Sequence, residues 1–177
     1  MNDVLKFWFE ELSPDDHFKK SDELDRKIEI RFRPVLERAA RAELWDWRNT
    51  ADGRLSEIIV RDQFSRNIFR DDARAFAQDP TALVLAQEMI RLGLDHEVAP
   101  ERRSFIYMPF MHSESKYIHE EAVRHFSQPG LENNLKFELL HKEIIDRFGR
   151  FPHRNKTLGR TSTHEEIEFL KTKNSSF

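Results

Sequence analysis

The chain contains three stretches in which acids, imidazoles and guanidinium groups gather, the residue types that serve acid–base chemistry and anion binding. The first ends a predicted helix. Asp62 follows Ile58 and Ile59 at helical spacing, so the period that buries those residues also turns the carboxylate inward. We expect a cationic or multi-donor partner for Asp62, because an unpaired buried carboxylate is costly; a structural ion pair is the alternative. The ligand-binding candidates here are Asp62, Gln63, Arg66 and Asn67.

The second stretch is Met108–Glu114. Pro109 is expected to end one helix and Ser113 to cap the next, which places His112 before a helix N-terminus and Glu114 in its first turn. A histidine and a glutamate at such a point can ligate a metal or act as acid and base. The structural alternative is that Glu114 complements the helix dipole, which explains the acid but not His112.

The third stretch, residues 147–160, holds five cations, one histidine and no acid. Arginine binds carboxylate and phosphate groups through two parallel hydrogen bonds. The run therefore predicts either an anionic ligand or partners among distant acids such as Asp62 and Glu114. Its aromatic residues indicate that it packs inward. The ligand-binding candidates are Arg147, Arg150, Arg154 and Asn155, and His153 is a catalytic candidate.

His141 connects these stretches. It lies in a predicted long helix on the same face as Phe137 and Phe148, so we expect it to point into the core. Alone, it is typical of a hydrogen-bonded core histidine. Together with His112, Glu114 and His153 it becomes a catalytic candidate.

Metal binding is a further interpretation. Glu138 and His141 have the Glu-x-x-His spacing of di-iron helical bundles, but the sequence has no second strict copy, and no metal ligand is predicted. The chain has no cysteine, which excludes disulfides, thiolate catalysis, zinc fingers and iron–sulfur clusters. The sequence identifies neither a cofactor nor an oligomeric state.

Helices must position these residues. Apolar residues recur three and four apart in nearly every segment, which predicts an all-α fold of about eight antiparallel helices, either a superhelix similar to tetratricopeptide repeats or a compact bundle. The expected helices cover residues 3–11, 22–42 with a kink or split at Pro34, a segment after Gly53, and residues 80–92, 100–108, 114–126, 131–148 and 164–172. In the fourth of these, Leu83, Val84, Ala86 and Ile90 are expected to form the buried stripe.

Length and composition limit the class of protein. The 177 residues suit one helical domain, expected over 1–172 with a frayed tail over 173–177, and the 15 Phe exclude a disordered chain. A net charge of −3 excludes a globally basic nucleic-acid-binding protein. No apolar run is long enough to span a membrane and no secretory signal is present, so we expect no membrane partner and a cytoplasmic location.

At these stretches the chain resembles the bacterial family called domain of unknown function 924, over nearly its whole length. The resemblance implies an all-helical fold similar to tetratricopeptide repeats. Two positions depart from the family pattern: Ser65 replaces a usual proline, and His119 stands where we expect glutamine, which alters a polar contact of the site. The matching segments are Val4–Phe9, Arg31-Phe32, Asp62–Asn67, Pro109–Glu114, His141, Arg147–Asn155 and Leu158–Arg160.

Two functions follow from these patterns. In the preferred one, the three stretches surround a pocket in which arginines hold a small anionic molecule or a peptide carboxylate, histidines supply protons, and acids orient them, which would support general acid–base hydrolysis. In the alternative, the protein is a non-enzymatic scaffold for a partner's helix or peptide, and each cation is already paired with an acid. The residues concerned are Arg66, Arg150 and Arg154, then His112, His141 and His153, then Asp62 and Glu114.

Overall fold

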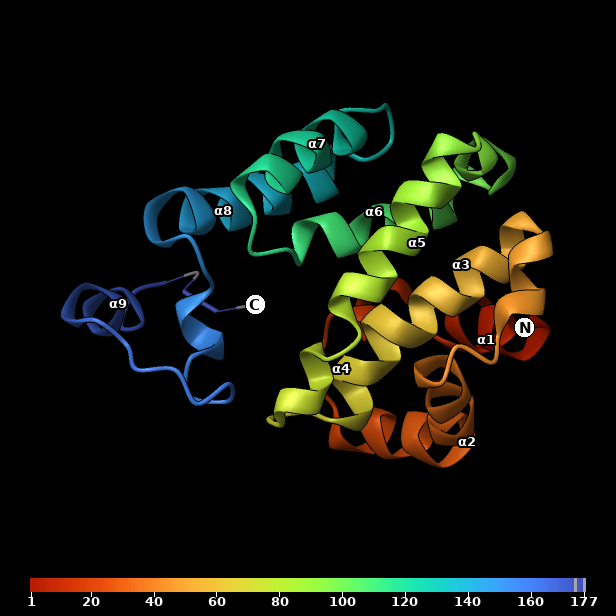
Figure 1. Ribbon diagram of the computed structural model, residues 1–177, viewed down its shortest axis with the longest axis horizontal. Helices are drawn as coiled ribbons and strands as arrows, with labels where there is room; N and C mark the ends of the chain where they lie inside the picture. The colour runs from red at the N-terminus through yellow and green to blue at the C-terminus, as the bar shows by residue number, and fades with distance from the viewer. Residues whose placement is uncertain (174, 177) are drawn as a thin grey trace. The chain divides into compact units, whose positions relative to one another are not determined.

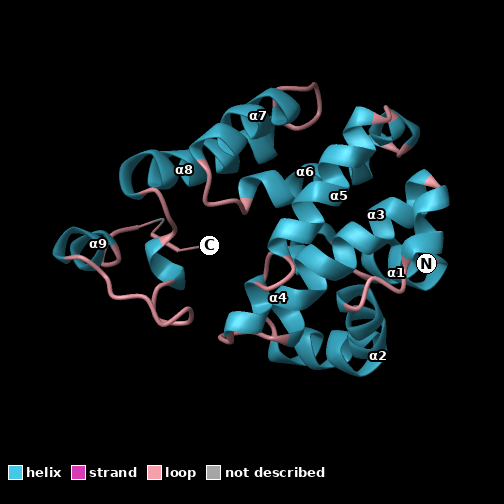
Figure 2. Ribbon diagram, viewed as in Figure 1, coloured by secondary structure: helices cyan, strands magenta, loops and turns pink. Residues whose placement is uncertain are grey.

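The computed structural model describes residues 1–173, 175 and 176, and every regular element within them is helical (Figure 1, Figure 2). The expected all-α class is confirmed. Short 3-10 or π-helical turns connect several of the α-helices. The α-helices are α1 (Asn2–Lys6), α2 (Asp22–Ala40), α3 (Ala51–Ile59), α4 (Ser65–Ile68), α5 (Asp79–Arg91), α6 (Pro100–Met111), α7 (Lys116–Phe126), α8 (Glu132–Phe148) and α9 (His164–Phe169).

The chain divides into two compact units. Unit 1 comprises Met1–Arg70 and Arg74–Pro109, and unit 2 comprises Asp71–Ala73 and Phe110–Phe177. The expectation of one domain over residues 1–172 stays a prediction. None of the helices in the described part of the chain is long and apolar enough to cross a membrane.

Helix α2 follows the apolar pattern of its sequence. The hydroxyl of Ser21 accepts a hydrogen bond from the Leu24 amide at 3.2 Å and caps the helix. The stripe predicted for this helix is buried throughout. Pro34 does not split it, because Pro34 and Ile30, whose carbonyl loses its helical donor, both lie on the exposed side.

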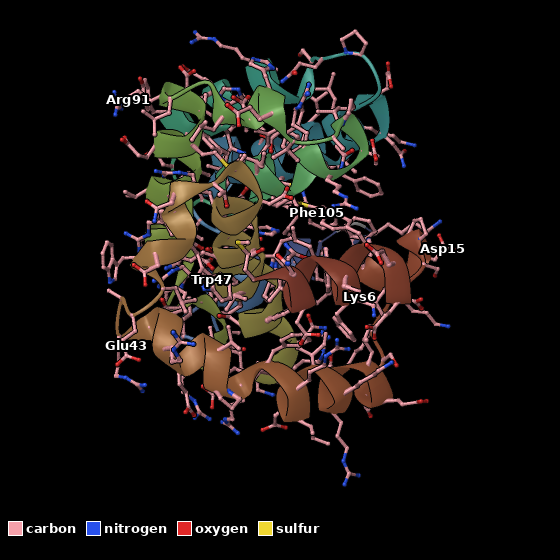
Figure 3. All side chains as sticks on the ribbon, turned by 90° about the vertical axis from the view of Figure 1, so that its right-hand side faces the viewer. Lys6, Asp15, Glu43, Trp47, Arg91 and Phe105 are labelled. Atoms are coloured by element: carbon pink, nitrogen blue, oxygen red, sulfur yellow. The ribbon has the colours of Figure 1, made fainter. Side chains whose placement is uncertain are left out.

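Aromatic rings form the core of unit 1. A π-helical turn, Phe7–Glu11, carries Phe7 and Trp8 inward, and Phe32 contacts Phe64 with ring centroids 4.7 Å apart. Phe105 of α6, labelled in Figure 3, contacts Trp8 edge-on at 5.6 Å. Such pairs add about 0.5–1.5 kcal/mol each to the free energy of burial.

Helix α3 leads into the first candidate stretch. It begins at Ala51, so Gly53 lies inside the first turn, where a Cβ atom would stand 1.9 Å from the Trp47 carbonyl oxygen. Only glycine permits that approach. The helix continues as a π-helical turn, Val60–Phe64, and then as α4, and these elements pack against α2 and α5.

Two predictions were wrong, one about which residues of α5 are buried and one about where α6 ends. In α5 the buried residues are Ala82, Leu85, Ala86 and Met89, and Val84 is 60% exposed. The expected stripe was out of phase by about one residue, or 100° on the helix. Helix α6 does not end at Pro109 but continues to Met111, because proline removes only its own hydrogen bond and the next two side chains are apolar and buried.

Unit 2 is built on α7 and α8, which lie side by side (Figure 1). Helix α8 ends as predicted at Gly149, whose φ of +69° is left-handed. The capping box of Thr163 and Glu166 starts α9, which ends at Phe169 rather than at Thr172. Ile144, Ile145 and Phe151 form a buried cluster with Phe148 and Phe169 packed against it.

Candidate functional site

In unit 1, Asp62 is buried and has the cationic partner that its position predicts. Arg66 Nη1 lies 3.4 Å from the Asp62 carboxylate, and the Gln63 amide donates to that carboxylate at 2.5 Å. Arg66 also binds both oxygens of Asp79, at 2.8 and 2.9 Å. Burial disfavours the charged guanidinium, but the two aspartates outweigh it and raise the pKa of Arg66.

Asn67 joins helices rather than facing an open site. Its side-chain amide donates to Asp25 of α2 at 2.8 Å, and Arg70 donates to the same oxygen at 2.7 Å. These bonds hold α4 against α2, so the contacts described for Asn67 are structural.

The strongest ionic cluster of unit 1 was not predicted. Glu57 is completely buried and accepts two hydrogen bonds each from Arg48 and Arg61, at 2.8–2.9 Å. Arg61 is buried as well and donates to the Ala39 carbonyl and to Gln78. Burial raises the pKa of Glu57, but the two guanidinium groups lower it further, so the net shift is downward. The i, i+4 spacing of Glu57 and Arg61 was the signal that could have revealed the pair.

In unit 2, the structure corrects the placement of His112 and Glu114. Because α6 ends at Met111 and α7 begins after Ser115, both residues lie in the connection between helices, and Glu114 precedes the N-cap of α7 instead of lying in its first turn. Glu114 accepts a hydrogen bond from the Phe151 amide at 2.8 Å and two from Arg160 at 2.7 and 2.9 Å. Burial opposes ionisation of Glu114, but Arg160 and the amide lower its pKa.

Two arginines of residues 147–160, the basic run, bind acids that follow this segment in the sequence. Arg147 donates to Glu165 at 2.8 Å, and Arg150 donates to both oxygens of Glu166 at 2.6 and 2.8 Å. The Arg150 bonds, aided by other donors, lower the pKa of Glu166 to about 2. Asn155 donates to Glu166 at 3.3 Å and accepts from Arg160 at 2.9 Å. Arg147, Arg150 and Arg160 therefore serve as structural partners of carboxylates.

Phe151 is the centre of the remaining candidates. Its ring is fully buried, and its centroid lies 5.7 Å from His141, 5.5 Å from His153 and 6.1 Å from His119. The guanidinium of Arg154, itself buried, lies 4.5 Å from the same ring. We call His119, His141, His153 and Arg154, arranged around Phe151, the imidazole cluster.

Burial favours the neutral form of His141. Its Nδ1 lies 2.8 Å from the Phe137 carbonyl oxygen, which can only accept, so Nδ1 carries the hydrogen and Nε2 is an acceptor. Burial lowers the pKa of His141 to about 3, with smaller contributions from His112, His119 and Arg154. The prediction that His141 points into the core is correct, and its catalytic role stays a prediction.

Glu138 and His119 form a buried pair that sequence reasoning did not recognise. Glu138 was considered only as half of a metal motif, whereas its carboxylate lies 2.6 Å from His119 Nδ1. Among residues 1–173, 175 and 176, no group of three or more histidine or acidic side chains is arranged to hold a metal ion.

A family model described as "Bacterial protein of unknown function (DUF924)" matches residues 4–174. The chain belongs to the DUF924 family. It is also similar to a solved structure, that of the protein of unknown function ATU0120 from Agrobacterium tumefaciens, at 38% identity over 96% of each chain with a TM-score of 0.91. A comparison with curated proteins finds no match. The resemblance noted from the sequence motifs is thus confirmed, and the family supplies no activity.

Unit 2 of this DUF924 protein also has a groove of about 250 Å³, lined by apolar and charged side chains of α8, α9 and the residues after α9. Its lining residues are Leu140, Glu143, Ile144, Arg147, Phe169, Thr172 and Lys173.

We expect Glu57→Gln to lower the free energy of unfolding by about 3–5 kcal/mol, because it removes the partner of the buried Arg61 guanidinium. Urea denaturation measures the change. The matched control is Glu43→Gln, which loosens an exposed pair with Arg41 and should leave the free energy of unfolding nearly unchanged. Equal effects of the two variants would contradict the role given to Glu57.

The free energy of unfolding should also fall in acid. Because Glu166 has a pKa of about 2 in the folded protein and about 4.3 in an unfolded chain, its contribution is complete above pH 5 and is lost as the pH falls toward 2. Glu166→Gln removes this contribution, so the unfolding free energy of the variant should decline less steeply over that range. Parallel curves for variant and wild type in urea titrations from pH 7 to 2.5 would refute the assignment.

Proposed function

We propose that this DUF924 protein binds a small molecule bearing a carboxylate or phosphate group at the imidazole cluster of unit 2. The observation that carries the proposal is the gathering of a buried guanidinium, Arg154, and three imidazoles around one buried ring. Arg154 is a fixed positive charge in this group and, after burial, helps to disfavour a charge on His141. A positive field at a partly water-excluded site attracts an anion.

The cations of the basic run then divide between two roles. Arg147, Arg150 and Arg160 hold Glu165, Glu166 and Glu114, and so build the scaffold. Arg154 is the cation proposed to meet the ligand, because its planar guanidinium can bind a carboxylate or phosphate with two parallel bonds. Ligand binding by Asp62, Gln63, Arg66 and Asn67 stays a prediction, and the bonds described for them tie helices of unit 1 together.

Binding is proposed ahead of hydrolysis. A catalytic base works best with a pKa near the operating pH, and His141, with a pKa of about 3, is a weak base at neutral pH. Its Nε2 serves as a hydrogen-bond acceptor that orients a hydroxyl or an amide. His112 and His153 remain the candidates for proton transfer if a reaction follows binding.

A scaffold function is the second candidate. It is favoured by the carboxylate partners of Arg147, Arg150 and Arg160, which account for much of the basic run without a ligand. The groove of about 250 Å³ in unit 2 would take an apolar side chain of a peptide against Leu140, Ile144 and Phe169. The predicted likeness to tetratricopeptide repeats would suit this candidate.

Thermal-shift and calorimetric titrations with inorganic phosphate, citrate and short hydroxy acids test the first proposal. Binding should raise the melting temperature of the wild type, and Arg154→Gln should weaken affinity at least tenfold, or about 1.4 kcal/mol. Arg147→Gln is the matched control, because its exposed pair with Glu165 lies outside the cluster, and it should keep wild-type affinity. Equal affinity in both variants would contradict the role of Arg154 and favour the scaffold.

A further inference from the structure

The pair formed by His119 and Glu138 is a completely buried contact between ionisable side chains in unit 2. Both side chains have no exposed surface, and His119 Nδ1 lies 2.6 Å from a Glu138 oxygen. The second ring nitrogen, Nε2, lies 2.8 Å from the Ser113 carbonyl oxygen. His119 therefore connects α7 both to α8 and to the segment that separates α6 from α7.

Hydrogen-bond chemistry restricts the protons of this pair. The Ser113 carbonyl can only accept, so His119 Nε2 carries a hydrogen. One further proton lies between Nδ1 and the carboxylate, either on the imidazole, giving an ion pair, or on Glu138, giving a neutral pair. Both forms have zero net charge, whereas adding or removing a proton would leave one charge in the core, where it is costly. The geometry thus favours a constant proton number in the pair.

The bond to Ser113 falls between two candidate residues of the site. Ser113 lies between His112 and Glu114, and Glu114 accepts the backbone amide of Phe151 at 2.8 Å. Hydrogen bonds therefore link Glu138 to His119 and His119 to the Ser113 carbonyl, and the next residue, Glu114, accepts the Phe151 amide with its side-chain carboxylate. Phe151 is also the ring around which the imidazole cluster is arranged.

We propose that His119 and Glu138 are positioning residues, a proton-sharing pair that fixes the His112–Glu114 connection and, through Glu114, the backbone at Phe151. In its link to ligand recognition this inference rests on the proposed function, since the groups it positions are those of the imidazole cluster. The fixed backbone keeps the Phe151 ring in contact with His141, which lies on α8 one turn after Glu138.

A positioning role differs from a purely stabilising one in a measurable way. Replacing both members of a buried ionic pair with apolar residues is often neutral or stabilising, because no charge then needs to be desolvated. We therefore expect the double variant His119→Leu/Glu138→Leu to fold with a melting temperature close to that of the wild type. It would nevertheless lose the donor to the Ser113 carbonyl, and with it the anchor of the connection.

The Phe151 amide reports on the anchor directly. In NMR spectra of the full chain, the double variant should shift the Phe151 amide proton upfield and speed its hydrogen exchange at least tenfold. In the single variant His119→Gln, the glutamine amide can still donate to the Ser113 carbonyl, so the Phe151 amide shift and exchange rate should stay as in the wild type. Leu131→Val, a buried change at the start of α8 and so at the other end of that helix from Gly149, is the matched control and should leave them unchanged. An unmoved Phe151 amide in a folded double variant would overturn the proposal.

Affinity for inorganic phosphate and citrate provides a second readout. The double variant should bind whichever of these probes the wild type binds at least tenfold more weakly, and His119→Gln should bind as the wild type does. If the wild type binds neither probe but the Phe151 amide moves as expected, the proposed ligand is refuted while the positioning role is supported. If the amide moves and affinity does not change, the link between the pair and the ligand site is overturned. If the double variant does not fold, the Phe151 amide is compared in the same way between two single variants, His119→Gln and Glu138→Leu.

Discussion

A charge can be buried in a helical core only where a partner of opposite sign or several hydrogen-bond donors offset its lost hydration. Both units of this DUF924 protein depend on that condition. In unit 1, Glu57 is enclosed by Arg48 and Arg61. In unit 2, Glu114 is held by Arg160 and by the Phe151 amide. Glu114 and Arg160 lie 46 residues apart, and Arg61 also reaches the Ala39 carbonyl 22 residues before it, so the polar contacts help to specify which helices and loops meet.

The cations of the basic run have different surroundings. Arg147 and Arg150 are matched to acids that follow the basic run, and Arg160 is matched to Glu114. Arg154 lies against the Phe151 ring beside imidazoles, and burial disfavours the charged form of one of them, His141. A site of this composition suits recognition of an anion better than proton transfer by His141, because the positive field stabilises negative charge and disfavours protonation.

Local sequence signals predicted the helices better than they predicted the partners of the charged residues. The apolar period of α2, the glycine that ends α8 and the capping box of α9 are each decided within a few residues, and all three were recognised. Glu114 and Arg160 lie 46 residues apart, so their bond depends on packing that no local pattern encodes. Pro109 misled the prediction of helix ends for a related reason, since burial of the residues that follow it sustains α6. His119 was noticed only as a departure from the family pattern, and its partner Glu138 was missed.

Anion binding at the imidazole cluster is tested most directly by following the histidine ring signals during a titration with inorganic phosphate and, separately, with citrate. Two-dimensional NMR spectra that resolve each imidazole distinguish the cluster from His17 and His96, which lie in unit 1. Binding at the cluster should shift the ring signals of His141 and His153 together and saturably, with those of His17 and His96 unchanged. Saturable shifts confined to His17 or His96, or no saturable shift of any ring with either anion, would contradict the claim that this cluster binds an anion.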